Sequence, residues 1–338
     1  MLRKILLAAV CLFGAGAAYV AFLLPSHRAA PDVRVERTEA RLARGKYLYE
    51  HVANCGDCHS GIDESRFGFP VIPGEAGKGR VMPAGMGLPG TVVAANLTPD
   101  PETGIGSLTD GQIIRAVREG IGHDGRPLFP LMPYAEYSSL SDDDVQALVA
   151  YLRTLPAIRH QLPSTKVSFP MNVIMRFLPK PVDSVPSPPS DPVSRGKYLT
   201  RISGCRFCHS PFEKGRPVEG RDFSGGHEFQ LAANARVVSA NLTPDQETGI
   251  GRWTEQEFLD QFAQFREYAA GTPPKVDYPY NTNMPWLGLS GVSDSDLKAI
   301  FAYLKTVNPV RNAVVTHPDA PEERNIPGYR KRTALPPR

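Results

Sequence analysis

The chain contains the five-residue pattern Cys-x-x-Cys-His twice, about 150 residues apart. Residues i, i+3 and i+4 share one face of a helix, so each pattern places two thiols and an imidazole side by side. Two thiols can bond the vinyl groups of a porphyrin, and the imidazole can bind its iron. The pattern therefore predicts two haem c groups. The predicted attachment points are Cys55, Cys58, Cys205 and Cys208, and the predicted iron ligands are His59 and His209.

Two other interpretations of these thiols compete with haem. The cysteine pairs could be coincidental, or four thiols with adjacent histidines could bind zinc. The fifth cysteine, Cys11, lies in an N-terminal apolar run, which leaves no disulfide partner in the rest of the chain. The formal net charge of +3 is too close to zero to indicate nucleic-acid binding. The 30 glycines and 33 prolines predict long ordered loops between few helices.

The N-terminus is apolar from Ile5 to Leu24, follows the basic pair Arg3-Lys4 and stops at Pro25. About twenty apolar residues can just span a bilayer as a helix, with the basic end in the cytoplasm. A cleaved secretory signal is the alternative, because Ala15-Gly16-Ala17 could serve as its cleavage site. We expect residues 1–24 to be an anchor or signal and residues 25–40 a tether. Either would place the body on the periplasmic side of a bacterial inner membrane, where haem attachment of the bacterial type occurs.

The body of the chain repeats itself at roughly 150 residues. The matching pairs are 44–48 with 195–199, 96–106 with 241–251, and Met132-Pro133 with Met284-Pro285. Only loop lengths differ between the copies, so one fold should occur twice. The predicted parts are a domain over 41–155, a proline-rich linker over 156–194 that packs against both copies, a domain over 195–308, and a tail over 309–338.

Each copy predicts the same three helices in the same order. They are a first helix near 40–54 or 192–204, a middle helix near 110–120 or 255–268, and a last helix that starts at Ser141 or Ser293. Capping boxes at Thr109 and Thr254 mark the start of the middle helices. Gly45 with Tyr151, repeated as Gly196 with Tyr303, indicates a close crossing of the first and last helices. Helices dominate, and no strand ladder is predicted.

A sixth iron ligand separates an electron carrier from a catalyst with an open iron site. Met132 lies in a loop stiffened by two prolines and is the methionine of its copy with a counterpart, Met284, before the last helix. A thioether is a soft donor that favours ferrous iron. Met82 and Met86 are rivals in the first copy. In the second copy the methionine loop is longer and His227 is the alternative, whereas His123 is expected to be exposed.

The chain resembles the multihaem cytochrome c subunits of bacterial membrane-bound dehydrogenases, such as those for alcohols and gluconate. The resemblance rests on the matching pairs above, on 128–134 and 150–153, and on Phe169–Val173. It implies an electron-transfer role, with a catalytic dehydrogenase subunit as donor and a quinone, an oxidase or another cytochrome as acceptor. It also implies that Met132 and Met284 complete the two iron sites. Those subunits usually carry three haem motifs, and this chain has two.

The sequence therefore predicts a mainly α protein with two tandem class-I-like cytochrome c domains after an N-terminal transmembrane helix. We expect one-electron transfer through two haems and no catalytic residues. The competing interpretation is a dihaem enzyme of the peroxidase or thiosulfate dehydrogenase type, in which one iron stays open or reactive.

Overall fold

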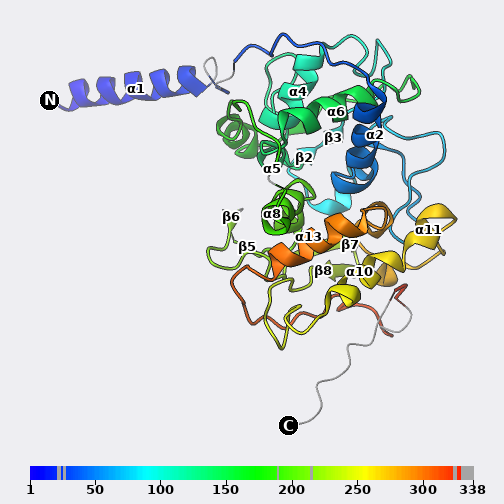
Figure 1. Cartoon of the computed structure of the whole chain (residues 1–338). Coiled ribbons are helices and arrows are strands. Elements are labelled where there is room, and N and C mark those ends of the chain that lie inside the picture. Colours follow the sequence, from blue (N-terminus) through cyan, green and yellow to red (C-terminus); the bar gives the residue numbers. More distant parts are fainter. Residues whose placement is uncertain (21–23, 26–27, 189, 214–215, 323–325, 329–338) are drawn as a thin grey trace.

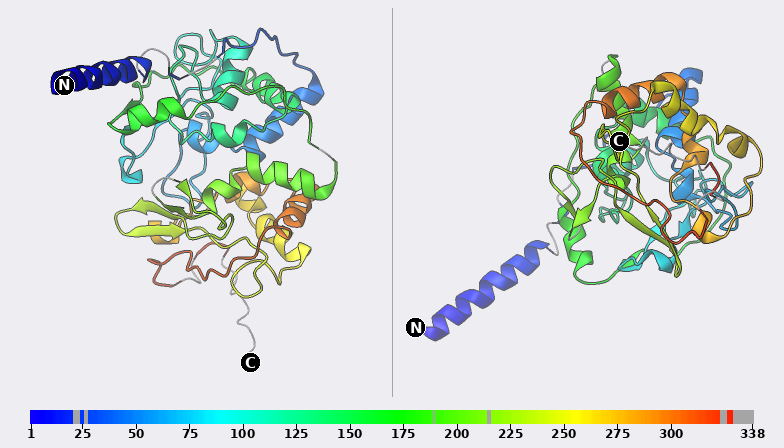
Figure 2. Two further views of the ribbon diagram at one scale, coloured as in Figure 1. Left: turned by 90° about the vertical axis from the view of Figure 1, so that its left-hand side faces the viewer. Right: turned by 90° about the horizontal axis from the view of Figure 1, so that it is seen from below.

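The computed structural model describes residues 1–20, 24–25, 28–188, 190–213, 216–322 and 326–328. Two helical units lie against each other, and an isolated N-terminal helix projects from one of them (Figures 1 and 2). The α-helices are α1 (Leu2–Ala18), α2 (Glu39–Tyr47), α3 (Gly56–His59), α4 (Asp110–Glu119), α5 (Tyr134–Tyr137), α6 (Asp142–Leu152), α7 (Met171–Ile174), α8 (Pro192–Ile202), α9 (Cys205–Cys208), α10 (Glu255–Ala263), α11 (Arg266–Ala270), α12 (Trp286–Leu289) and α13 (Asp294–Leu304). Short π and 3-10 turns form η2 (Leu48–Val52), η3 (Ala84–Met86), η4 (Met175–Phe177) and η5 (Tyr278–Tyr280).

The N-terminal helix α1 is shorter than the sequence predicted. It covers 17 residues, and Ile5, Leu6 and Leu12 on it are exposed. Within the described part of the chain, no helix has both the length and the apolar character needed to cross a membrane. The spanning helix expected over Ile5–Leu24 is therefore not found, although residues 21–23 lie outside the described residues.

The internal repeat is visible in the structure as two sets of helices in the same order. The first repeat comprises α2 to α6, and the second repeat comprises α8 to α13. Both predicted capping boxes are present, at Thr109 with Gln112 and at Thr254 with Glu257. Ser141 and Ser293 cap the last helices, as predicted. The predicted helix over 255–268 is divided in two, because α10 ends at Ala263 and α11 begins at Arg266.

The first and last helices of each repeat cross at a glycine. A β-carbon built on Gly45 would lie 1.9 Å from the carbonyl oxygen of Ala147 on α6. A β-carbon on Gly196 would lie 1.9 Å from the same atom of Ala299 on α13. Any side chain here would force the backbones apart, so the close crossing predicted from the two glycines is confirmed.

Strands are few but not absent, which corrects the prediction of no ladder. The longest pair is an antiparallel hairpin of β7 (Glu228–Ala232) and β8 (Ala235–Val238) in the second repeat. The two strands are joined by a two-residue connection, and burial alternates along β8, as in other hairpins. The sequence did not predict this hairpin because its strands are short. The other strands pair β1 (Arg80–Val81) with β3 (Val93–Ala94), β2 (Gly90–Thr91) with β4 (Lys166–Val167), and β5 (Phe212–Glu213) with β6 (Arg216–Pro217).

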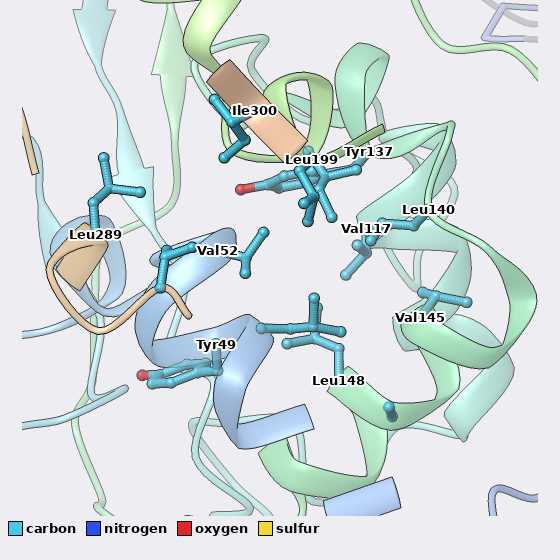
Figure 3. Packing of buried hydrophobic residues seen from close by; sticks show 14 of the residues in the cluster. Tyr49, Val52, Val117, Tyr137, Leu140, Val145, Leu148, Leu199, Leu289 and Ile300 are labelled. Carbon is cyan, nitrogen blue, oxygen red and sulfur yellow. The ribbon is translucent and has the colours of Figure 1, made fainter. Parts of the chain in front are cut away.

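One hydrophobic cluster joins the two repeats. Its buried members include Val52 and Leu148 of the first repeat and Leu199 and Ile300 of the second. Figure 3 shows side chains of both repeats converging in this cluster. A continuous core means that the two units are packed together rather than strung on a linker.

The segment between the repeats hydrogen-bonds to the first repeat along its length. The amide of Ile158 donates to Thr98 Oγ1, β4 pairs with β2, and the amide of Val185 donates to Asp142. The tail after α13 does the same for the second repeat, where Asp319 forms an ion pair with Arg236 at 2.8 Å. The basic residues at 330–332 lie outside the described residues.

Candidate haem sites

Each Cys-x-x-Cys-His pattern forms one turn of helix. Cys55 directly precedes α3, which ends at His59. The second pattern forms α9 and the residue that follows it, His209. None of the four cysteines is in a disulfide bond. Burial raises the pKa of the Cys58 thiol to about 11, although this side chain keeps accessible surface.

The two motif histidines are held in the same way. Nδ1 of His59 lies 2.8 Å from the carbonyl oxygen of Ala95, and Nδ1 of His209 lies 2.7 Å from that of Ala240. A carbonyl oxygen only accepts, so the proton sits on Nδ1 and the lone pair of Nε2 is free for a metal. Burial lowers the pKa of both imidazoles, which keeps them neutral. The donor set therefore fits haem iron in both repeats.

The repeated Asn-Leu-Thr-Pro-Asp segments position these carbonyl oxygens. Asn96 directly follows Ala95, and its Nδ2 donates to the carbonyl of Ile158 at 2.8 Å. Asn241 follows Ala240 and donates to the carbonyl of Val310 at the same distance. Each loop thus ties the histidine's acceptor to the chain that leaves the last helix. Sequence reasoning missed this role, although the exact repetition of the motif was a signal for it.

The two methionine loops also have matching geometry. The amide of Tyr134 donates to the carbonyl of Met132 at 2.8 Å, and the amide of Trp286 donates to that of Met284 at 2.7 Å. Both methionines are partly buried and pack against the shared core, as do Cys55 and Cys205. The same tight turn therefore presents a thioether in each repeat.

The rival ligands lie in different surroundings. Met82 is buried near the β1–β3 pair, whereas Met86 is at the surface on η3 and His123 is exposed, as expected. The ring of His227 stacks on Phe229 at 4.5 Å and meets Phe212 edge-on at 5.3 Å. A charge on His227 acts to lower the pKa of His209, so the two imidazoles lie near each other. His227 therefore sits beside the histidine of the second motif.

The short helix after each methionine contacts the other repeat. In the first repeat this helix is α5, where Glu136 forms ion pairs with Arg201 at 3.2 Å and with Arg206 of the second motif at 3.9 Å. In the second repeat it is α12, where the carbonyl of Gly288 lies 2.9 Å from Nδ1 of His51. Each methionine loop is thus joined to the partner repeat's first helix or motif.

A reciprocal pair of tyrosines completes this junction. The hydroxyl of Tyr47 in the first repeat donates to Asp296 at 2.8 Å, and that of Tyr198 in the second donates to Asp144 at 2.6 Å. Each aspartate is buried and is also held by an arginine of its own repeat, Arg44 or Arg195. Two equivalent networks therefore fix the repeats against each other.

The zinc interpretation finds no support in the part of the chain that the structure describes. No group of three or more histidine, cysteine, aspartate or glutamate side chains is arranged there to hold a metal ion.

Comparisons with known proteins agree with this geometry. A family model described as cytochrome c oxidase, cbb3-type, subunit III matches residues 40–152, and a model described as cytochrome c matches residues 193–308. The chain is a c-type cytochrome with two cytochrome c domains. This cytochrome carries two haem c groups, one for each domain.

Several relatives are subunits of dehydrogenases. The chain is 30% identical to the cytochrome c subunit of a quinone-dependent alcohol dehydrogenase from Gluconobacter oxydans, over 85% of this chain and 57% of the relative. It is 30% identical to the gluconate 2-dehydrogenase cytochrome c subunit of Pantoea cypripedii, over 80% of this chain and 60% of the relative. A dihaem c-type cytochrome from Cereibacter sphaeroides is 28% identical, over 78% of this chain and 85% of the relative. The cytochrome thus spans little more than half the length of the first two.

Proposed function

We propose that this cytochrome relays electrons, one at a time, from a dehydrogenase to a respiratory acceptor such as a quinone, an oxidase or another cytochrome. The dehydrogenase subunits among its relatives support the donor. The observation that carries the relay is the junction between the repeats, which brings two equivalent haem-binding motifs together. Cys58 of the first motif and Cys208 of the second are close enough for one to act on the pKa of the other.

In each repeat, different residues would bind the porphyrin and the iron of the haem. We assign Cys55 and Cys58, and likewise Cys205 and Cys208, to the covalent links, and His59 and His209 to the iron. When bound, each haem c supplies an iron that changes its oxidation state by one electron. The carbonyls of Ala95 and Ala240 hold the imidazoles in the tautomer that leaves Nε2 free.

We assign Met132 and Met284 as the sixth ligands. They would hold the two irons together with His59 and His209, whereas the ring of His227 is engaged by the rings of Phe207 and Phe229. The matched turns at the two methionines favour one ligand type in both repeats. With a thioether and an imidazole as protein ligands, each iron would have no position left for a substrate, which suits a carrier better than a peroxidase or a thiosulfate dehydrogenase.

We also propose that the N-terminal segment directs the body across the bacterial inner membrane, either as an anchor or as a cleaved signal. Its support is the basic pair Arg3-Lys4 before an apolar run. The mass of the mature protein decides between the two, because cleavage at Ala15-Gly16-Ala17 shortens the chain whereas an anchor leaves it whole. Release from membranes by alkaline carbonate would argue against an anchor.

The ligand assignment is tested with Met132→His and Met284→His, made separately in the haem-loaded protein. Each substitution should lower the midpoint potential of its own centre and leave the other unchanged, because imidazole stabilises ferric iron more than a thioether does. Met86→His is the control, since Met86 lies at the surface on η3. Unchanged spectra and potentials in both variants would contradict the assignment. High-spin iron or peroxide turnover in the unaltered protein would favour the enzyme.

A further inference from the structure

Tyr137 occupies the place where the two haem-binding motifs come together. It ends α5, five residues after Met132, and is only 6% exposed. Its hydroxyl donates to the carbonyl of Ala53 at 3.1 Å, two residues before Cys55. The side chain is therefore anchored to the start of the first motif.

The same side chain reaches the second motif. Cys208 acts on the ionisation of the Tyr137 hydroxyl together with Cys55 and Cys58, so thiols of both motifs lie near it. The neighbouring Glu136 pairs with Arg206, which lies inside the second motif. The helix α5 also packs against α8, which leads into that motif, and Tyr137 and Leu199 belong to the same buried cluster (Figure 3). Tyr137 is thus a residue of the first repeat placed between both motifs.

The second repeat has a different residue at the position that corresponds to Tyr137. Counting from the methionines, the counterpart of Tyr137 is Leu289. Both residues are buried and both belong to the helix that contacts the other repeat. A leucine therefore satisfies the packing that this position requires within a repeat. The aromatic ring in the first repeat needs a separate explanation, and its position between the motifs offers one.

We propose that Tyr137 is a positioning residue whose ring sets the electronic coupling between the two haem sites of this cytochrome. The inference depends on the proposed relay. Electron tunnelling falls steeply across empty space, and a close-packed ring leaves neither a void nor water between two centres. The hydroxyl serves to fix the ring through Ala53, so the ring rather than the hydroxyl carries the effect.

The test measures internal electron exchange in the full haem-loaded protein, after rapid photochemical reduction of one haem in a fraction of the molecules. Tyr137→Leu should slow the exchange by roughly tenfold, because the smaller side chain leaves a gap between the two sites. The absorption spectra and both midpoint potentials should stay unchanged, since no iron ligand is touched. Tyr137→Phe keeps the ring and should retain the rate. Tyr137→Met likewise leaves part of the space of the ring unfilled, so it should be as slow as the leucine variant, and it replaces that variant as the test if the leucine variant folds poorly.

Val145→Ala is the matched control, because it opens a cavity in the same core on α6 rather than at the motifs. Its exchange rate should equal that of the unaltered protein. Unchanged rates in Tyr137→Leu and Tyr137→Met, or an equal loss in Val145→Ala, would overturn the inference and leave the relay intact. Absence of exchange in the unaltered protein would refute the relay and, with it, the role of Tyr137.

Discussion

The two repeats hold their haem motifs by the same contacts but differ where they face each other. Both share the glycine crossing, the histidine-to-carbonyl bond and the capped last helix. The second repeat adds the β7–β8 hairpin and a longer methionine loop, and it has Leu289 where the first has Tyr137. The contacts that hold the motifs are thus the same in both repeats, whereas the contacts between the repeats differ outside the two tyrosine networks.

The longer loop shows what this difference does. Residues 273–281 of the second repeat run along residues 64–68 of the first, where the amide of Phe67 donates to the carbonyl of Pro274 at 2.9 Å. The amide Nδ2 of the fully buried Asn281 donates to the carbonyl of Arg66 at 2.9 Å. The ring of Phe67 stacks on Phe265 at 5.5 Å. An insertion that made the methionine geometry doubtful in the sequence therefore serves as a clasp on the other repeat.

The largest effect should follow from removing the side chain that the clasp encloses. Phe67 is 1% exposed, so Phe67→Ala should lower the free energy of unfolding by about 3–5 kcal/mol. Phe169→Ala is the matched control, because that ring is 80% exposed and its loss should change little. Denaturation by guanidinium chloride measures both. A small loss in the Phe67 variant would mean that the clasp contributes little to joining the repeats.

The glycine crossings should respond equally in the two repeats. Gly45→Ala and Gly196→Ala each force a β-carbon against a backbone carbonyl, so each should cost about 3 kcal/mol, the upper end of the usual range for over-packing. Gly85→Ala meets nothing within 4 Å and serves as the control. Unequal losses in the same denaturation experiment would show that one crossing relaxes more easily than the other.

The tyrosine networks test whether the junction is as symmetric as its geometry. Tyr47→Phe and Tyr198→Phe each remove a hydrogen bond to a buried carboxylate and the bond that the hydroxyl accepts from the amide of Ser293 or Ser141, which should cost about 1.5–3 kcal/mol. Tyr19→Phe, at an exposed position, should have no effect. If only one of the two junction variants loses stability, the networks are equivalent in geometry but not in energy.

The smallest effect concerns acid stability at two matching turns. Hydrogen bonds from the side chain and amide of Thr103 lower the pKa of Asp100, and Thr248 does the same for Asp245. A lowered native pKa stabilises the fold above the ordinary value of 3.8, and this contribution disappears as the pH falls through the native pKa. Asp100→Asn and Asp245→Asn should each be slightly less stable than the unaltered protein at neutral pH. The difference should vanish in acid, and a difference that persists there would contradict the explanation.

Local patterns predicted much of the fold. The helix caps at Thr109, Ser141 and their counterparts depend on residues three apart, so the sequence could place them. The β7–β8 hairpin was missed because its strands are short and its alternation is weak. The membrane-spanning helix was expected from hydropathy alone, and within the described residues the structure has no such helix.

The sequence by itself determined the two haem motifs, the internal repeat and the glycines at the helix crossings, because each is written in residues close together or in a segment that recurs. Only the tertiary structure decided how the repeats face each other, with Tyr47 bonded to Asp296 across 249 positions of the chain. It also placed Tyr137 between the motifs and the clasp around Phe67. Such contacts join distant segments that share no local pattern, so they arise only when the two units pack into one core.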